Sequence, residues 1–264
     1  MGIERALLLI ADIGGYTRFM KVHRINLAHA QTVITELLEA VIDGAPSPLK
    51  LSKLEGDAAF FYAPISRSET DLTPFSQLVT SIRLSFLRKQ REMTIDQVCT
   101  CDGCTQVGQL KLKFVAHDGE VALHKVKGMR ELAGVDVITV HRMLKNSVPL
   151  SEYVLMTDRV AGALGTPLKP FLQQGQEDLE GLGEVTTYFI DLNEIAKAPP
   201  PEVMPSGFRR WFNYFRLTAR ALPYMLGLKK SCDDFKNMDQ ALGLAPGPAA
   251  PAPQPPGEAR GTPS

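Results

Sequence analysis

The chain has 264 residues, of which 44% are apolar and 22% are charged, as in an ordinary globular protein with one sizeable core. Its 29 basic and 29 acidic residues cancel, so charge gives no argument for nucleic acid binding, and we expect no such partner. No apolar run reaches the length of about 18 residues that a transmembrane helix needs, and Asp12 interrupts the short N-terminal run. These features predict a cytoplasmic protein.

The first half of the sequence alternates between strand and helix patterns. Residues 6–12 predict a buried strand, because their apolar residues are consecutive. Residues 27–41 predict a helix, since apolar residues recur at steps of three and four, and Gly44 can end it. Residues 49–64 then predict a hairpin whose turn lies at Glu55-Gly56-Asp57.

The rest of the globular part continues this alternation. The expected elements are a helix at 74–92, a strand at 110–126 with a break at Asp118-Gly119, a helix at 134–146, and strands at 153–156 and 185–192. The order strand, helix, strand, strand, helix, strand is that of a split βαβ unit. We therefore predict an α+β fold with a ferredoxin-like sheet and helices on one face.

Composition divides the chain into four expected parts. Residues 1–195 form the globular domain, 196–206 a Pro-rich linker, 207–244 a basic aromatic helical segment, and 245–264 a disordered Pro/Ala tail.

The aromatic segment has two interpretations. Phe208, Trp211, Phe212 and Phe215 form a helical stripe flanked by arginines, which would suit an anionic membrane surface contacted through residues 208–226. More often, such a stripe packs against the domain's own core or at a dimer interface.

The predicted topology brings two carboxylates to the same edge of the sheet. Asp12 ends the first strand and Asp57 lies at the hairpin tip; in a split βαβ sheet the first and third strands are neighbours, so both side chains reach the same edge. Two carboxylates there suit Mg²⁺ or Mn²⁺ together with substrate phosphates. Alternatively, Asp12 caps the following helix and Asp57 is a turn residue.

Five stretches, in order, resemble the motifs of class III nucleotidyl cyclases over about residues 6–192. They are IADIGGYTRFM, KLEGDAAFFY, LKFVAHDGEVALHKVKG, ELAGVDVITVHRML and GLGEVTTYFI. The resemblance implies a homodimer with its site between two subunits, and a reaction in which a ribose 3′-hydroxyl attacks the α-phosphate of a nucleoside triphosphate.

The resemblance also implies roles for individual residues. Asp12 and Asp57 would hold Mg²⁺ or Mn²⁺, Lys53 would select adenine and so ATP, Glu131 would assist base recognition, and Arg142 would stabilise the transition state.

Two positions depart from the family pattern. Ile138 replaces the asparagine that orients the ribose, and Leu182 replaces the lysine that binds the triphosphate. Two functions therefore remain open: an adenylate cyclase-like enzyme, or a catalytically degenerate module that binds nucleotide or metal in signalling.

A cysteine cluster lies outside the family pattern. Cys99, Cys101 and Cys104 fall within six residues, and in a reducing compartment such a cluster suits Zn²⁺ or a redox switch. A loop of free thiols is the third interpretation, since a structural zinc site needs a fourth ligand.

Overall fold

The computed structural model describes residues 2–22, 27–65, 75–95, 106–164 and 168–195, together with residues 211, 212, 215, 218, 219 and 222. The cysteines at 99, 101 and 104, the expected linker 196–206 and the expected tail 245–264 lie outside the described residues. No helix within the described part is long and apolar enough to cross a membrane.

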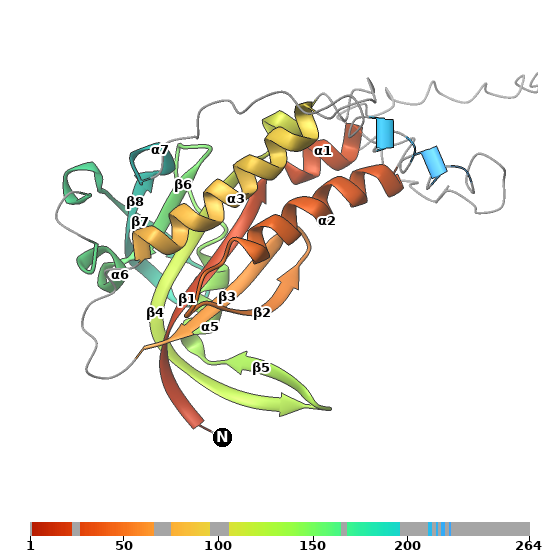
Figure 1. The fold of residues 1–264 in the computed structure, drawn as a ribbon. Coiled ribbons are helices and arrows are strands. Elements are labelled where there is room, and N and C mark those ends of the chain that lie inside the picture. Colours follow the sequence, from red (N-terminus) through yellow and green to blue (C-terminus); the bar gives the residue numbers. More distant parts are fainter. Residues whose placement is uncertain are drawn as a thin grey trace, which may run out of the picture.

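The described residues form eight strands of one mixed sheet (Figure 1). They are β1 (Gly2–Gly14), β2 (Lys50–Glu55), β3 (Ala58–Pro64), β4 (Lys111–Val126), β5 (Met129–Ala133), β6 (Tyr153–Thr157), β7 (Gln173–Leu179) and β8 (Gly183–Asp191). Seven strands follow the order β2-β3-β1-β4-β6-β8-β7, and β5 pairs with β4 beside this path. Only the pairing of β4 with β6 is parallel among these strands. The central position of β1, between β3 and β4, confirms the predicted neighbours.

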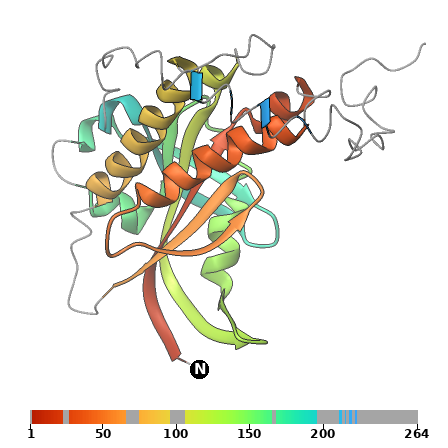
Figure 2. The same cartoon turned by 45° about the vertical axis from the view of Figure 1, so that its right-hand side comes forward.

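Helices cover both faces of the sheet. The helical elements are α1 (Tyr16–Val22), α2 (Leu27–Asp43), α3 (Phe75–Ile95), α5 (Val135–Arg142), α6 (Asp158–Gly162), α7 (Leu192–Ile195) and the 3₁₀ turns η1 (Val107–Gln109) and η2 (Lys169–Phe171). The long helices α2 and α3 lie side by side on one face (Figures 1 and 2). The predicted α+β class is confirmed, but the expectation of helices on one face holds only for the long helices, because the short helix α5 covers the opposite face.

Strand β1 contributes to two hydrophobic cores. Its residues Leu7, Leu9, Ala11 and Ile13 face the core under α2 and α3. The alternate residues Ala6, Leu8 and Ile10 face the core that contains Val137 and Val140 of α5. Burial on both faces explains the uninterrupted apolar run in the sequence.

Helices α2 and α3 approach closely where α2 ends. A Cβ atom at Gly44 would lie 2.6 Å from the Cβ of Ser85, a distance that a real side chain does not tolerate. The hydroxyl of Ser81 donates a hydrogen bond of 2.8 Å to the Gly44 carbonyl. Gly44 therefore both ends α2 and lets α3 pack against it.

The expected break at Asp118-Gly119 is wrong, because β4 runs through both residues without interruption. They pair with Leu7 and Ala6 of β1. The buried Asp118 carboxylate accepts a hydrogen bond of 2.8 Å from Nε of Arg5, also on β1. This ion pair lets residues typical of turns lie inside a strand.

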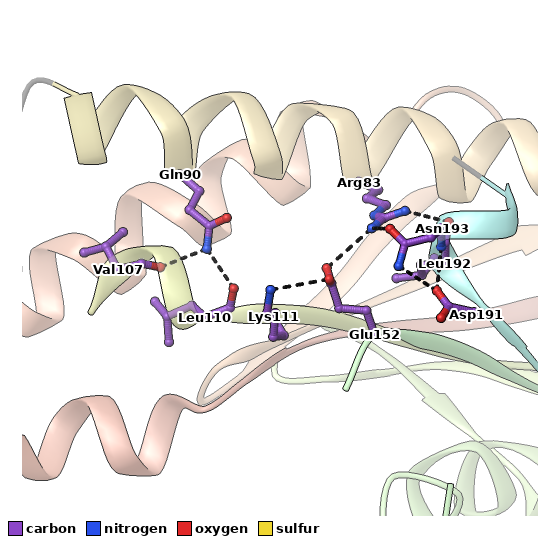
Figure 3. A network of polar contacts seen from close by, with 9 residues as sticks. All are labelled: Arg83, Gln90, Val107, Leu110, Lys111, Glu152, Asp191, Leu192 and Asn193. Atoms are coloured by element: carbon purple, nitrogen blue, oxygen red, sulfur yellow. Dashed lines mark hydrogen bonds and ion pairs between the residues drawn. The ribbon is translucent and has the colours of Figure 1, made fainter. Parts of the chain in front are cut away.

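A buried polar network joins α3 to the end of β8 (Figure 3). Arg83 of α3 is 1% exposed, and its guanidinium donates to the Leu192 carbonyl at 2.6 Å and to Oδ1 of Asn193 at 2.8 Å. Its Nη2 atom also lies 3.7 Å from the Glu152 carboxylate. These contacts fix α3 over the last strand of the domain.

A second polar contact fixes the other end of α3. Nε2 of Gln90 donates to the carbonyl oxygens of Val107 at 2.8 Å and Leu110 at 2.7 Å (Figure 3). Both carbonyls precede β4, so the C-terminal part of α3 is joined to the start of that strand.

Candidate functional site

The structure brings Asp12 and Asp57 together at one end of the sheet. Asp12 of β1 pairs with Ala58, the residue that follows Asp57 in the β2–β3 turn. The backbone N–H of Ile13 donates a hydrogen bond of 3.1 Å to the Asp57 carbonyl. The two residues predicted to share an edge are therefore neighbours.

A lysine completes this cluster. Lys113 of β4 is the cross-strand partner of Asp12, and its Nζ lies 2.8 Å from Oδ2 of Asp12. The sequence alone did not single out Lys113. The position of Lys113 beside Asp12 follows from the β1–β4 register, which no local sequence pattern predicts.

The charges of the cluster shift its pKa values. Burial and the nearby charge of Asp12 raise the pKa of Asp57 to about 6, against the opposing effects of a backbone hydrogen bond and of Lys113. Burial alone would lower the pKa of Lys113, but the hydrogen bond and charge of Asp12 outweigh it and raise that pKa. Asp57 therefore responds electrostatically to Asp12, as closely spaced carboxylates do.

The donor set suits a divalent cation that shares its coordination with another ligand. The carboxylates of Asp12 and Asp57 lie at one edge of the sheet, and the Lys113 ammonium contacts that of Asp12. Carboxylate oxygens are the ligands that Mg²⁺ or Mn²⁺ prefers. Among the described residues no group of three or more His, Cys, Asp or Glu side chains could hold a metal. The pair thus fits an ion completed by water and phosphate oxygens, and not one enclosed by protein ligands.

Lys53 lies on the neighbouring edge strand, β2. Its Nζ is 2.9 Å from Oε1 of Glu55 on the same strand. Oε1 of Glu55 also lies 2.9 Å from Nε2 of His141 on α5. Lys53, which was predicted to select the base, therefore contacts Glu55, and Glu55 in turn contacts His141 on α5.

His141 is held by two acceptors. Its Nδ1 lies 2.6 Å from the Val137 carbonyl, and its Nε2 faces the Glu55 carboxylate. Both ring nitrogens therefore face an oxygen that can accept a hydrogen bond. Burial would raise the pKa of Glu55, but the hydrogen bonds from Lys53 and His141 outweigh it and lower that pKa. The ring also packs edge-on against Phe60, at 4.8 Å between centroids.

Glu131 and Arg142 make their contacts elsewhere than at the carboxylate pair. Glu131 of β5 pairs with His124, further along β4 than Lys113. Strand β5 approaches β2, the strand of Lys53. The Arg142 guanidinium is paired with Glu180 in the β7–β8 turn. No side-chain contact among the described residues joins Glu131 or Arg142 to Asp12 or Asp57.

The two positions that depart from the family pattern lie on α5 and in the β7–β8 turn. Ile138 is 49% exposed on α5. Leu182 packs against the core on the α5 side of the sheet, and its N–H donates to the Leu179 carbonyl at 2.8 Å. The hydroxyl of Thr139 donates to Val135 within the helix.

A further set of polar residues anchors the start of α5. His117 lies with Nδ1 2.9 Å from the Thr157 hydroxyl and Nε2 2.9 Å from Oδ1 of Asp136. The other oxygen of Asp136 accepts a hydrogen bond of 2.6 Å from the N–H of Glu120. Thr157 is buried, so we interpret this set as the anchor that fixes α5 to β4 and β6.

Comparison with known sequences identifies relatives. A sequence model described as "Protein of unknown function (DUF2652)" matches residues 34–153. The "Uncharacterized protein Rv2561/Rv2562" of Mycobacterium tuberculosis is 44% identical over 216 residues, which are 81% of this chain and 98% of that protein.

Comparison with solved structures supports the fold. The guanylate cyclase domain of RhGC from Catenaria anguillulae, solved with GTP, gives a TM-score of 0.50 at 15% identity and covers 72% of this chain and 98% of that one. A class III adenylyl cyclase-like ATP-binding protein from Pseudomonas aeruginosa gives 0.53 at 16% identity, covering 73% and 40%. The adenylyl cyclase CyaB of P. aeruginosa gives 0.50 at 11% identity, covering 78% and 98%. The chain therefore has a class III cyclase-like fold.

Proposed function

This chain belongs to the same family as the M. tuberculosis protein Rv2561/Rv2562, and from its class III cyclase-like fold we propose that it is a divergent class III nucleotidyl cyclase-like enzyme. Its substrate is a nucleoside triphosphate, ATP by preference, and its product is a cyclic nucleotide. The observation that carries the proposal is the convergence of Asp12 and Asp57 at one end of a class III cyclase-like sheet.

The proposal includes a homodimer, because no described side-chain contact joins Glu131 or Arg142 to the carboxylate pair. Asp12 and Asp57 form one group at the end of β1, while Lys53 and Glu131 lie on β2 and β5, strands that approach each other. A complete site then takes the carboxylates from one subunit, and Lys53, Glu131 and Arg142 from its partner. A two-fold axis makes two equivalent sites from these groups.

The proposed role of each site residue follows from the charge of its side chain. Asp12 and Asp57 hold Mg²⁺ or Mn²⁺, which when bound polarises phosphate oxygens and favours ionisation of the attacking hydroxyl. Lys53 contacts the purine with its ammonium, and Glu131 fixes the orientation of the base. Arg142 leaves Glu180, which lies in an exposed turn, and neutralises charge that develops on the phosphate.

A degenerate nucleotide-binding module is the second candidate. The apolar Ile138 and Leu182 and the engagement of Arg142 with Glu180 favour it. In this case both carboxylates still bind metal, or metal with nucleotide, and the protein acts in signalling without turnover.

One assay separates the two candidates. Purified protein is incubated with ATP and Mn²⁺, and cyclic nucleotide is measured beside the Asp57→Ala variant. Product from the wild type that disappears in the variant supports the enzyme. Absence of product from both, with Mn²⁺-dependent binding of ATP intact in the wild type, supports the module.

We also propose a peripheral membrane contact through residues 208–226. Of the described residues in that segment, Trp211, Phe212, Phe215 and Leu222 expose large apolar side chains. Arginines flank them in the sequence, as in helices that lie on anionic lipid. Co-sedimentation with vesicles of phosphatidylcholine alone and with added phosphatidylserine tests this, and equal partitioning in both contradicts it.

For Cys99, Cys101 and Cys104 the proposals remain Zn²⁺ binding or a redox switch. Zinc analysis of protein purified without chelator tests the first. Thiol titration before and after mild oxidation tests the second, and four reactive thiols in both states contradict it.

A further inference from the structure

We propose that Lys113 is a built-in competitor of the divalent metal for Asp12, and that metal binding turns it into a ligand for a phosphate oxygen of the nucleotide. The inference rests on the proposed function, in that Asp12 and Asp57 hold the metal. It adds a third residue with two successive partners: a carboxylate in the metal-free protein, and an anionic phosphate in the loaded one.

The backbone holds Lys113 at the site. Cross-strand pairing of Lys113 with Asp12 puts both side chains on the same face of adjacent central strands. The ammonium lies 2.8 Å from Oδ2 of Asp12, within the range of a strong charge-assisted hydrogen bond. The Lys113 side chain remains 25% exposed, so its tip is accessible to a ligand as well as to Asp12.

The charge of the cluster changes sign when a metal binds. Two ionised carboxylates and one ammonium sum to −1, so the metal-free cluster still attracts a cation. A divalent ion brings the sum to +1, and repels an ammonium hydrogen-bonded to one of its own ligands. Lys113 must then give up its bond to Asp12, at least in part.

The released ammonium has few alternatives among its described neighbours. Tyr153 lies beside it on β6, but the Tyr153 hydroxyl is engaged with Oδ1 of Asn146 at 2.9 Å. Burial raises the pKa of Tyr153, which keeps that hydroxyl neutral. A polyphosphate bound to the metal supplies the missing anion, and lysine binds phosphate oxygens as a compact point charge.

The two roles predict opposite effects of one substitution. Removing the ammonium with Lys113→Gln removes the competitor, so Mn²⁺ alone binds about 10-fold more tightly. The same change removes the phosphate contact, so the gain in Mn²⁺ affinity on adding a non-hydrolysable ATP analogue falls by about 10-fold. A lysine that merely orients Asp12 would instead weaken Mn²⁺ binding in both measurements.

The experiment is a titration of full-length protein with Mn²⁺, followed by electron paramagnetic resonance of the free ion, with and without the analogue. Lys111→Gln is the matched control: Lys111 lies two residues earlier on β4 and its Nζ faces Glu152, 3.5 Å away. We expect wild-type values for it. Lys113→Arg keeps a cation beside Asp12, and we expect its affinity for Mn²⁺ alone to stay near that of the wild type.

Each result decides a separate point. Weaker binding of Mn²⁺ alone by Lys113→Gln, in protein that melts as the wild type does, overturns the competitor role. An unchanged gain from the analogue overturns the phosphate role, and failure of both proteins to bind Mn²⁺ overturns the inference as a whole. Because no turnover is measured, a wild type that binds Mn²⁺ without making cyclic nucleotide contradicts only the proposed enzyme.

Discussion

Nε2 of His141 on α5 lies 2.9 Å from Oε1 of Glu55 on β2, so one side-chain contact joins the helix of Arg142 to the hairpin of Asp57. The two ends of this contact come from residues 86 positions apart. The contact therefore links α5 to the β2–β3 hairpin, and both elements carry residues of the proposed site.

A double-mutant cycle measures that coupling. Glu55→Gln, His141→Ala and the double variant are unfolded with urea at pH 6. We expect the two substitutions to be non-additive by about 1 kcal/mol, a modest value because both side chains are about one quarter exposed and screened by water. Additive losses would show that the contact contributes nothing to the fold.

The carboxylate of Asp57 makes stability depend on pH. Its pKa is about 6 in the folded chain and 3.8 in the reference state, so folding favours the protonated form. The contribution of Asp57 to the free energy of unfolding is complete below pH 3.8, declines as the pH rises towards 6, and is absent above pH 6. Asp57→Asn removes this decline, so its advantage over the wild type grows between pH 4 and pH 7, to about 1–2 kcal/mol after allowing for partial exposure.

Urea unfolding without divalent metal at three pH values checks this prediction. Asp43→Asn, at an exposed carboxylate where α2 ends, is the control for the substitution of an aspartate by asparagine. A constant difference between Asp57→Asn and wild type over the same range would contradict the prediction.

The close approach of Gly119 to Asp136 predicts a strong effect of a single methyl group. A Cβ at position 119 would lie 2.2 Å from Cγ of Asp136, the carboxylate that binds His117 and the N–H of Glu120. Gly119→Ala should therefore cost about 3 kcal/mol of unfolding free energy and loosen the start of α5. Gly108→Ala adds its methyl group to open space and serves as the control. Equal stability of the two variants would contradict the packing described here.

Removal of the buried Arg83 should be costly as well. Arg83→Ala leaves the Leu192 carbonyl and Glu152 without their guanidinium contacts, at a cost of roughly 3–5 kcal/mol. Arg83→Lys should recover only part of this, because one ammonium cannot reproduce the planar set of donors. Thermal unfolding followed by circular dichroism measures both variants, and full recovery by lysine would contradict the role of geometry.

Local sequence patterns predicted the fold well where one physical signal dominated. The uninterrupted apolar run of 6–12 marked a strand buried on both faces, and the turn at 55–57 fixed the hairpin that carries Asp57. Two strands were missed: β5, whose sequence MRELA places two charged residues together, and β7, an edge strand of sequence QQGQEDL, which is too polar for a strand pattern.

Prediction of the site was limited by register and by ion pairs across elements. The juxtaposition of Asp12 and Asp57 followed from topology alone. Lys113 and His141 depend on which residue faces which, a property of the assembled sheet. The misplaced break at Asp118 has the same origin, since Arg5, its partner, is 113 residues away in sequence.

The double hydrogen bond of Gln90 joins α3 to the start of β4 by a contact of its own, beside the covalent connection between them. One buried amide serves two carbonyl oxygens, so its loss would leave both acceptors without their donor at once. The position of α3 over the sheet therefore depends on a single side chain at this end of the helix.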